Sequence, residues 1–229
     1  MADFQLYAFW RSSATYRVRV ALALKGLTAE ERYIDLDAGD QRGADFLKIN
    51  PLGAIPALIG PGQSVLTQSL AILEYLDETV PNPPLLPADP LGRARVRSIA
   101  AGLGADMHPL IVPRVRRYLM TTGGFDADAW RAWQMQWFTA GLQALETRLA
   151  TEAGTGAYCH GDTVTMADIL LMSIVMVMRT FSIAVADVPT VDRIVALCEG
   201  QAAFAKAAPS RQVGAPPAGA DPYAPRAAP

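Results

Sequence analysis

Three hydroxyl side chains lie close together near the amino terminus, where they could bind an anion. Ser12, Ser13 and Thr15 follow the apolar run Leu6–Trp10 and precede a helical pattern of apolar residues. In an open α/β sheet, ligands bind at such a strand-to-helix turn, because amide N–H groups and the helix dipole present positive potential there. The segment is therefore predicted to hold an anion, and the alternative is that the hydroxyls only cap the helix.

Two further segments offer groups that suit a peptide-like ligand. Gln68 and Ser69 open a helical pattern, where Ser69 and its backbone N–H could bind a carboxylate, with simple capping as the alternative. Pro56 lies near the start of a predicted strand and has no N–H. The backbone of Ile55 before it is therefore free to pair with an extended ligand.

The elements that must position these residues alternate between strand and helix. The run at 6–10 predicts a strand, and the helical spacing that follows predicts a helix that Gly26 ends. The later elements are predicted to be a strand at 31–36, a short helix at 45–49, strands at 55–59 and 64–66 joined by a hairpin turn, and a helix with Leu70, Leu73 and Leu76 on one face. The order βαβαββα predicts a small mixed sheet flanked by helices.

A proline-rich segment separates this region from the rest of the chain. Residues 80–90 contain five prolines, so neither a helix nor a central strand continues through them. Domains are therefore predicted at 1–82 and 91–206. The second is predicted to be all-α, with helices at 91–121, 127–150, 166–184 and 190–206. The Ala- and Pro-rich residues 207–229 are predicted to form a peripheral or mobile extension.

Two local features of the helical part have structural consequences. Pro109 and Pro113 each remove a helix hydrogen bond, so the first long helix should kink there and could shape a cleft wall beside His108. A lone histidine can equally be a packing or surface residue. Thr165 and Asp168 have the spacing of a capping box, which predicts a structural role for Asp168 at the start of a helix.

The composition excludes several classes of protein. Of the 229 residues, 51% are apolar and 18% are charged, which excludes intrinsic disorder for the chain as a whole. The balance of 20 Lys and Arg against 22 Asp and Glu gives a net charge of −2, so nucleic acid is not an expected partner. Cys159 and Cys198 form no CxxC pair, so neither a disulfide framework, a metal site nor a dithiol redox centre is indicated.

The sequence also predicts no association with a membrane. Asp3 and Gln5 interrupt the start of the chain, so we expect no signal peptide. The apolar stretch Ile169–Met178 is shorter than the roughly 20 residues that span a bilayer, and Asp168 and Arg179 close it at both ends. We expect this stretch to be a buried helix of a cytoplasmic protein.

The motifs, taken in their order along the chain, resemble the glutathione transferase family. Within that family, Arg11–Leu22 is similar to the signature of the zeta class, which includes maleylacetoacetate and maleylpyruvate isomerases. Residues 50–58, 68–72 and 161–168 extend the resemblance, which covers roughly residues 4–206. It implies a thioredoxin-like N-terminal domain followed by an all-α domain, glutathione as cofactor, a small-molecule substrate and a homodimer.

The resemblance also implies roles for individual residues. Ser12 would face the sulfur of glutathione as the catalytic serine, with Ser13 and Arg11 beside it. Lowering a thiol pKa of about 8.5 by two units needs roughly 2.7 kcal/mol of thiolate stabilisation, which a hydroxyl donor and a helix N-terminus could supply. Ile55 would pair its backbone with the cysteinyl part of the tripeptide, with Pro56 expected in the cis form.

The remaining roles concern the ends of glutathione and the substrate. Gln68 and Ser69 would hold the γ-glutamyl carboxylate, and His108 would lie near the glycine end of the tripeptide or near the substrate. The cations expected to stabilise the carboxylate and enolate oxygens of the substrate are Arg11, Arg114 and Arg179. For each of them, the alternative is a solvated position on the surface.

The activity implied by the resemblance is cis–trans isomerisation of a maleyl keto acid in the degradation of aromatic compounds. Two positions depart from the family pattern: Ala14 stands where the signature usually has a cysteine, and Thr180 stands where an arginine usually precedes the position of Phe181. Ala14 disfavours chemistry that needs an enzyme thiol. The alternatives are a transferase or dehalogenase that consumes glutathione on a small electrophile such as an α-halo acid, and a non-catalytic binding module.

Overall fold

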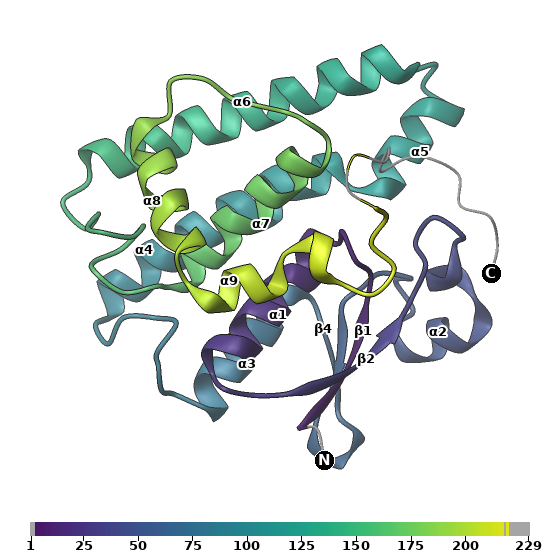
Figure 1. Ribbon diagram of the computed structural model, residues 1–229, viewed down its shortest axis with the longest axis horizontal. Helices are drawn as coiled ribbons and strands as arrows, with labels where there is room; N and C mark the ends of the chain where they lie inside the picture. The colour runs from purple at the N-terminus through teal and green to yellow at the C-terminus, as the bar shows by residue number, and fades with distance from the viewer. Residues whose placement is uncertain (1–2, 218, 220–229) are drawn as a thin grey trace. The chain divides into compact units, whose positions relative to one another are not determined.

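The computed structural model describes residues 3–217 and residue 219 (Figure 1). By their contacts, the described residues divide into two units. The first contains the chain up to Pro84 together with the described residues from Gln201 onward, and the second is Leu85–Gly200. No helix in these described ranges is long and apolar enough to cross a membrane.

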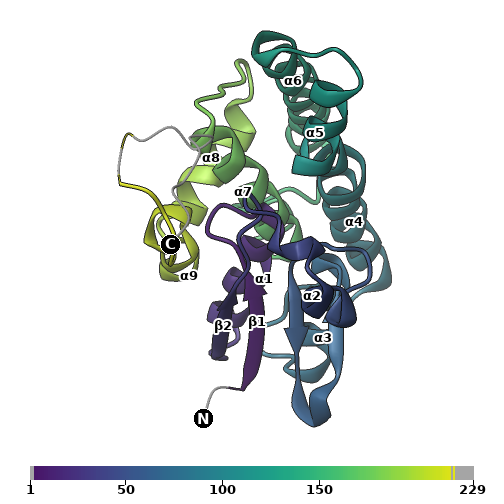
Figure 2. The ribbon, with the colours of Figure 1, turned by 90° about the vertical axis from the view of Figure 1, so that its right-hand side faces the viewer.

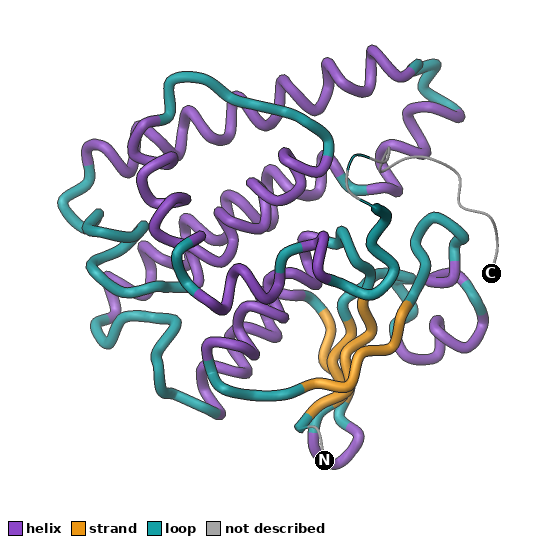
Figure 3. Tube along the Cα trace, in the orientation of Figure 1, coloured by secondary structure: helices purple, strands orange, loops and turns teal. Residues whose placement is uncertain are grey.

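The first unit contains a four-stranded mixed sheet in the order β2-β1-β3-β4. Its strands are the orange segments in Figure 3. β1 (Phe4–Ala8) pairs in parallel with β2 (Ala29–Tyr33) and antiparallel with β3 (Ala57–Ile59), which pairs antiparallel with β4 (Val65–Thr67). Leu6 lies opposite Glu31 on one side and Leu58 on the other. The predicted fold class, a thioredoxin-like mixed sheet with helices followed by an all-α part, is confirmed.

Two strands begin and end earlier than their apolar runs predict. β1 ends at Ala8 because the chain then turns, with the amide of Ser12 donating to the carbonyl of Phe9 over 3.2 Å. β2 ends at Tyr33 because the carboxylate of Asp35 accepts the amides of the next residues and forms a turn. The apolar pattern marked the strands correctly, but the turns set their ends.

Among the described residues, three α-helices complete the N-terminal part of the first unit: α1 (Ser13–Leu24), α2 (Ala44–Ile49) and α3 (Ser69–Thr79). α1 and α3 pack against each other. Leu6, Leu58, Val18 and Leu73 are fully buried and form part of the apolar interior. α1 ends before Gly26, whose φ of +67° is a conformation that glycine adopts at little cost.

Ion pairs of buried cations fix α1 relative to the rest of this unit. The guanidinium of Arg19 makes a two-pronged pair with Glu31 on β2, with both contacts at 2.7 Å. Lys25 Nζ lies 2.7 Å from Asp77 on α3 and donates to the carbonyl of Pro83. Because removing one partner of such a pair leaves a buried charge unpaired, these contacts resist movement of the helix.

The last helix, α9 (Ala202–Ala207), packs on α1 (Figures 1 and 2). The sequence predicted one helix at 190–206, but the structure has α8 (Pro189–Glu199) and α9, separated at Gly200 and Gln201. Glycine is a poor helix former, and the break lets Phe204, which is 2% exposed, be buried in the first unit. The domain division at 82 and 91 stays a prediction, although the contacts group α9 with the N-terminal residues.

The segment after α9 is less peripheral than the sequence predicted. Ala207, which ends α9 and begins the predicted extension, is buried, and a short 3₁₀ turn follows at Pro209–Arg211. Gly214 has a φ of +82° and lies so close to Tyr33 that an added Cβ would come within 2.5 Å of its ring. The described part of the segment therefore packs on the edge of the sheet, and the remainder of the predicted extension lies outside the described residues.

The second unit is helical. The helices expected at 127–150 and 166–184 are observed with slightly different ends, and the one expected at 91–121 is divided into two. The α-helices of the second unit are α4 (Pro90–Ala101), α5 (Pro113–Thr121), α6 (Ala127–Thr151), α7 (Met166–Thr180) and α8. Between α4 and α5 the chain forms a π-helical turn at Gly102–Met107 and a 3₁₀ turn at His108–Ile111, which confirms the predicted kink.

The capping box predicted at Thr165 is present. Asp168 accepts hydrogen bonds from the amide and the hydroxyl of Thr165, both at 2.8 Å, and from the amide of Cys159. Burial raises the pKa of Asp168, while these hydrogen bonds favour its ionised form. The predicted structural role of Asp168 is therefore confirmed.

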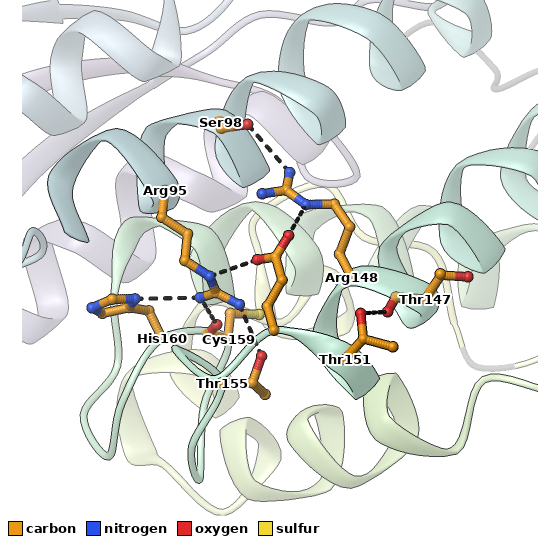
Figure 4. Close-up of polar contacts among 9 residues, drawn as sticks. Arg95, Ser98, Thr147, Arg148, Thr151, Thr155, Cys159 and His160 are labelled. Carbon is orange, nitrogen blue, oxygen red and sulfur yellow. Dashed lines mark hydrogen bonds and ion pairs between the residues drawn. The ribbon is translucent and has the colours of Figure 1, made fainter. Parts of the chain in front are cut away.

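An arginine on α4 connects α4, the end of α6 and the loop that follows (Figure 4). Arg95 pairs with Glu152 at 2.7 Å and donates to the hydroxyl of Thr155 and the carbonyl of Cys159. Arg148 binds the other oxygen of Glu152, and its hydrogen bond lowers the pKa of that carboxyl group. This network determines the path of the chain into the loop before α7.

We predict that Phe204→Ala destabilises the protein by about 3 kcal/mol, because it removes a fully buried ring between α9 and its neighbours. Urea unfolding followed by circular dichroism measures the change. Leu197→Ala on α8 is the matched control, since Leu197 is 41% exposed and its truncation should cost much less. Equal stabilities of the two variants would contradict the packing of α9 described above.

Candidate functional site

Ser12 lies at the turn between β1 and α1 and is the N-cap of the helix. Its Oγ accepts a hydrogen bond from the amide of Thr15 at 3.2 Å. The capping alternative is thus confirmed, but it does not exclude the functional one. As the oxygen is the acceptor in this bond, the hydroxyl proton remains able to donate to an anion at the positive end of α1.

The neighbouring hydroxyls are less accessible. Ser13 is the first residue of α1 and is 6% exposed, and Thr15 is fully buried within the first turn. Ser12 itself is only partly buried. Of the three hydroxyls noted in the sequence, Ser12 is therefore the one best placed to meet a ligand, and Ser13 contributes by forming the first turn of the helix.

Arg11 is held in a fixed orientation. Its guanidinium makes a two-pronged pair with Asp37, at 2.6 and 2.9 Å, and lies over the rings of Phe9 and Trp10, at 5.1 and 5.5 Å from their centres. Its side chain is only 9% exposed. The cation is therefore directed by aromatic and acidic neighbours, and Asp37 offsets part of its charge at the turn.

Ile55 and Pro56 precede the short strand β3. The peptide bond between them is cis, as the resemblance implied. The paired part of β3 begins at Ala57, which lies opposite Tyr7 on β1. The backbone of Ile55 thus lies outside the ladder of the sheet, where it can pair with an extended ligand, as the sequence predicted.

Gln68 and Ser69 lie at the start of α3, as predicted. Gln68 is exposed and has a φ of +67°. This backbone conformation is uncommon for residues other than glycine, and the residues that adopt it are concentrated at functional sites. Ser69 is 6% exposed, and its Oγ accepts a hydrogen bond from Nη1 of Arg17 at 3.1 Å. This hydrogen bond links the start of α3 to α1, and the two helices also pack against each other.

Arg17 is the residue that the sequence analysis missed. It is 2% exposed, and burial lowers its pKa to about 9, so it remains a cation at neutral pH. The available signal was its place in the run Arg17-Val18-Arg19, where charged residues occupy positions of a helix that is buried on almost all sides. A buried arginine needs a structural or functional reason.

The other candidates belong to the second unit. His108 begins the 3₁₀ turn after the π-helical turn, and Arg114 is an exposed residue in the first turn of α5. Arg179 lies in the last turn of α7 and pairs with Glu199 on α8, at an exposure of 50%. Within this unit, Arg179 is thus an ion-paired surface residue.

Comparisons with known proteins agree with this geometry. The family model "Glutathione S-transferase, N-terminal domain" matches residues 2–78. A maleylpyruvate isomerase of Ralstonia sp. is 41% identical over 91% of this chain and 98% of its own length, and a maleylacetoacetate isomerase of Pseudomonas aeruginosa is 38% identical over 93% and 100%. The chain belongs to the zeta class of the glutathione transferase family.

Solved structures extend the likeness to three dimensions. The maleylacetoacetate isomerase of Methylobacterium extorquens AM1, solved with malonate and glutathione bound, is 50% identical with a TM-score of 0.90, covering 93% of this zeta-class chain and 99% of its own. A maleylpyruvate isomerase described as a zeta-class bacterial glutathione S-transferase gives a TM-score of 0.89 at 40% identity, over 93% of this chain and all of its own. The zeta-class fold thus extends over both units.

We predict that Ser12→Ala lowers the stability of this zeta-class protein by about 1 kcal/mol, because the variant loses the cap of α1. Ser12→Asn is the control, since asparagine caps helices about as well as serine and should keep stability near that of the wild type. Urea unfolding measures both. If the alanine variant is as stable as the wild type, the cap does not form in solution.

Proposed function

We propose that this zeta-class protein is a glutathione-dependent cis–trans isomerase of a maleyl keto acid, such as maleylacetoacetate or maleylpyruvate. The observation that carries the proposal is the placement of Ser12, whose hydroxyl caps α1 and keeps its proton available to donate at the positive helix end. Relatives that are 38–41% identical over nine-tenths of the chain and are named as these isomerases support the same function.

The residues of the first unit fit glutathione along its length. The hydroxyl of Ser12 suits the sulfur, the unpaired stretch of backbone at Ile55 suits the cysteinyl amide, and Ser69 suits the γ-glutamyl carboxylate. The backbone of Ile55 is available because the paired part of β3 begins only after Pro56. Ser69 suits a carboxylate because it is the first residue of α3. Each therefore offers the type of group that the corresponding part of a tripeptide needs.

When bound, glutathione would supply a thiolate nucleophile that adds reversibly to the conjugated cis double bond and leaves after the bond has rotated. The task of Ser12 is to donate its hydroxyl hydrogen to the sulfur and hold it ionised. The amides of the first turn of α1 contribute positive potential at the same place. Ser13, buried in this turn, keeps the amides in position.

The substrate would need positive groups near its carboxylate and enolate oxygens. We assign this role to Arg11 at the turn in the first unit. For the second unit, the resemblance implies Arg114 and Arg179 as cations and His108 as a further substrate-binding residue. Arg11 is pre-oriented by Asp37, so its binding to a carboxylate would cost little side-chain entropy. As part of the same proposal, the protein acts as a homodimer, which the family resemblance implies, and it does so in the cytoplasm.

One measurement, the amount of glutathione consumed per turnover, distinguishes an isomerase from a transferase. An isomerase returns its glutathione, whereas a transferase or dehalogenase consumes one molecule in each turnover. Ala14 is compatible with both reactions, because in each of them the nucleophile is the sulfur of glutathione and not an enzyme thiol. Stoichiometric loss of glutathione during turnover of the cis substrate would replace the proposed function with the transferase.

We predict that Ser12→Ala lowers kcat for maleylpyruvate about 100-fold, the usual cost of removing a preorganised hydrogen-bond donor. The Kd for glutathione should change less than about threefold, since the backbone and the carboxylate contacts remain. Loss of the cis isomer gives kcat, and calorimetry gives Kd. Ser64→Ala is the control at an exposed serine of the same unit. An unchanged kcat in the Ser12 variant would remove Ser12 from the mechanism.

We predict that Arg11→Ala raises the KM for a carboxylate substrate about tenfold, which corresponds to roughly 1.4 kcal/mol of lost binding. Arg32→Ala makes the same change of charge at an exposed arginine of β2 and should leave KM unchanged. Initial rates over a range of substrate concentrations give both values. If the KM of the two variants is the same, the carboxylate binds elsewhere.

A further inference from the structure

We propose that Arg17 is a positioning residue for glutathione, which makes the hydroxyl of Ser69 a hydrogen-bond donor to the γ-glutamyl carboxylate. This inference rests on the proposed function. Arg17 does not touch the ligand in this account. It acts through Ser69, from a buried place on α1 behind the start of α3.

The direction of the hydrogen bond between the two side chains carries the argument. A guanidinium group has only N–H donors, so in the 3.1 Å contact between Arg17 Nη1 and Ser69 Oγ the serine oxygen must accept. A hydroxyl has one hydrogen, which is then free to point away from Arg17. A carboxylate oxygen can only accept, so a serine whose hydrogen points outward is matched to it.

Burial makes this arrangement stable and directional. Arg17 is 2% exposed and Ser69 is 6% exposed, so water competes little for the bond between them. A hydrogen bond from a charged donor is shorter and stronger than one between neutral groups, and it polarises the hydroxyl that accepts it. Ser69 should therefore be a better donor to an anion than a serine that is hydrated on all sides.

The surrounding backbone favours the same ligand. Ser69 is the first residue of α3, an 11-residue helix whose first amides have no partner within the helix. Gln68 precedes it with an exposed side chain and a positive φ, which turns the chain into the helix. The positive charge of Arg17, the amides of α3 and the hydroxyl of Ser69 thus all favour one carboxylate.

The contact also connects two parts of the proposed site. Arg17 lies five positions after Ser12 on α1, and the side chain reaches the start of α3. α1 therefore contributes the hydroxyl for the sulfur at its first turn and the cation behind the carboxylate site further along. A shift of α1 would disturb both ends of the ligand together.

The test compares the binding of two thiols by calorimetry. Glutathione has the γ-glutamyl group, and cysteinylglycine lacks it. Arg17→Met replaces the cation with a neutral side chain of similar length. We expect it to weaken glutathione binding about 10- to 100-fold, the size of a lost hydrogen bond to a charged group, and to leave cysteinylglycine binding unchanged. Arg17→Lys keeps the charge and should retain part of the preference for glutathione.

A double-mutant cycle isolates the action through Ser69. Ser69→Ala should lower the preference for glutathione by itself, and Arg17→Met should have little further effect in that background. Arg19→Met is the matched control on the same helix, because Arg19 is buried and pairs with Glu31. It should lower the melting temperature without changing the ratio of the two thiol affinities.

Three results would overturn the proposal: an equal loss of affinity for both thiols in Arg17→Met, full additivity with Ser69→Ala, or a wild type that binds the two thiols equally. A wild type that binds neither thiol would overturn the proposed function as well. If Arg17→Met does not fold, Arg17→Lys and Ser69→Ala decide, and an unchanged preference for glutathione in both would overturn the role of Arg17.

Discussion

The burial of three cations on one helix is the constraint on which the rest of the first unit depends. Arg17 and Arg19 of α1 and Lys25, the C-cap of α1, are each at most 8% exposed, and their bonds run to the start of α3, to β2 and to the end of α3. Moving a buried charge away from its partner costs several kcal/mol. α1 therefore has one favoured position against the sheet and α3, and its first turn, with Ser12 as cap, is held with it.

This arrangement explains how a short turn can perform chemistry. A serine at the end of a mobile helix would lose much of its effect on a thiolate, because donors that must reorganise stabilise charge less than donors that are already in place. Here the N–H of Thr15 fixes the oxygen of Ser12, and the aromatic pair Phe9 and Trp10 fixes the neighbouring Arg11. Ala14 removes an enzyme thiol from the turn, which leaves the sulfur of the cofactor as the nucleophile.

The sequence predicted the order of elements well because each has a clear local signal. The period of apolar residues predicted α1 and α3, and Gly60-Pro61-Gly62 predicted the hairpin between β3 and β4. It failed where a distant contact decides. The place of Arg17 among apolar helix positions was a weak local signal, and the sequence does not show that its side chain reaches Ser69 at the start of α3. The place of α9 was likewise missed, because its burial depends on α1, about 180 residues earlier in the chain.

The measurement that tests the central claim most directly is the titration of the thiol of bound glutathione in the wild-type protein, followed by the ultraviolet absorption of the thiolate. A fixed hydroxyl donor at the positive end of α1 should lower the pKa of the sulfur from about 8.5 by about two units, which corresponds to roughly 2.7 kcal/mol of preference for the thiolate. A bound thiol that titrates at the value of free glutathione would contradict the account, because the start of α1 would then do nothing for the sulfur.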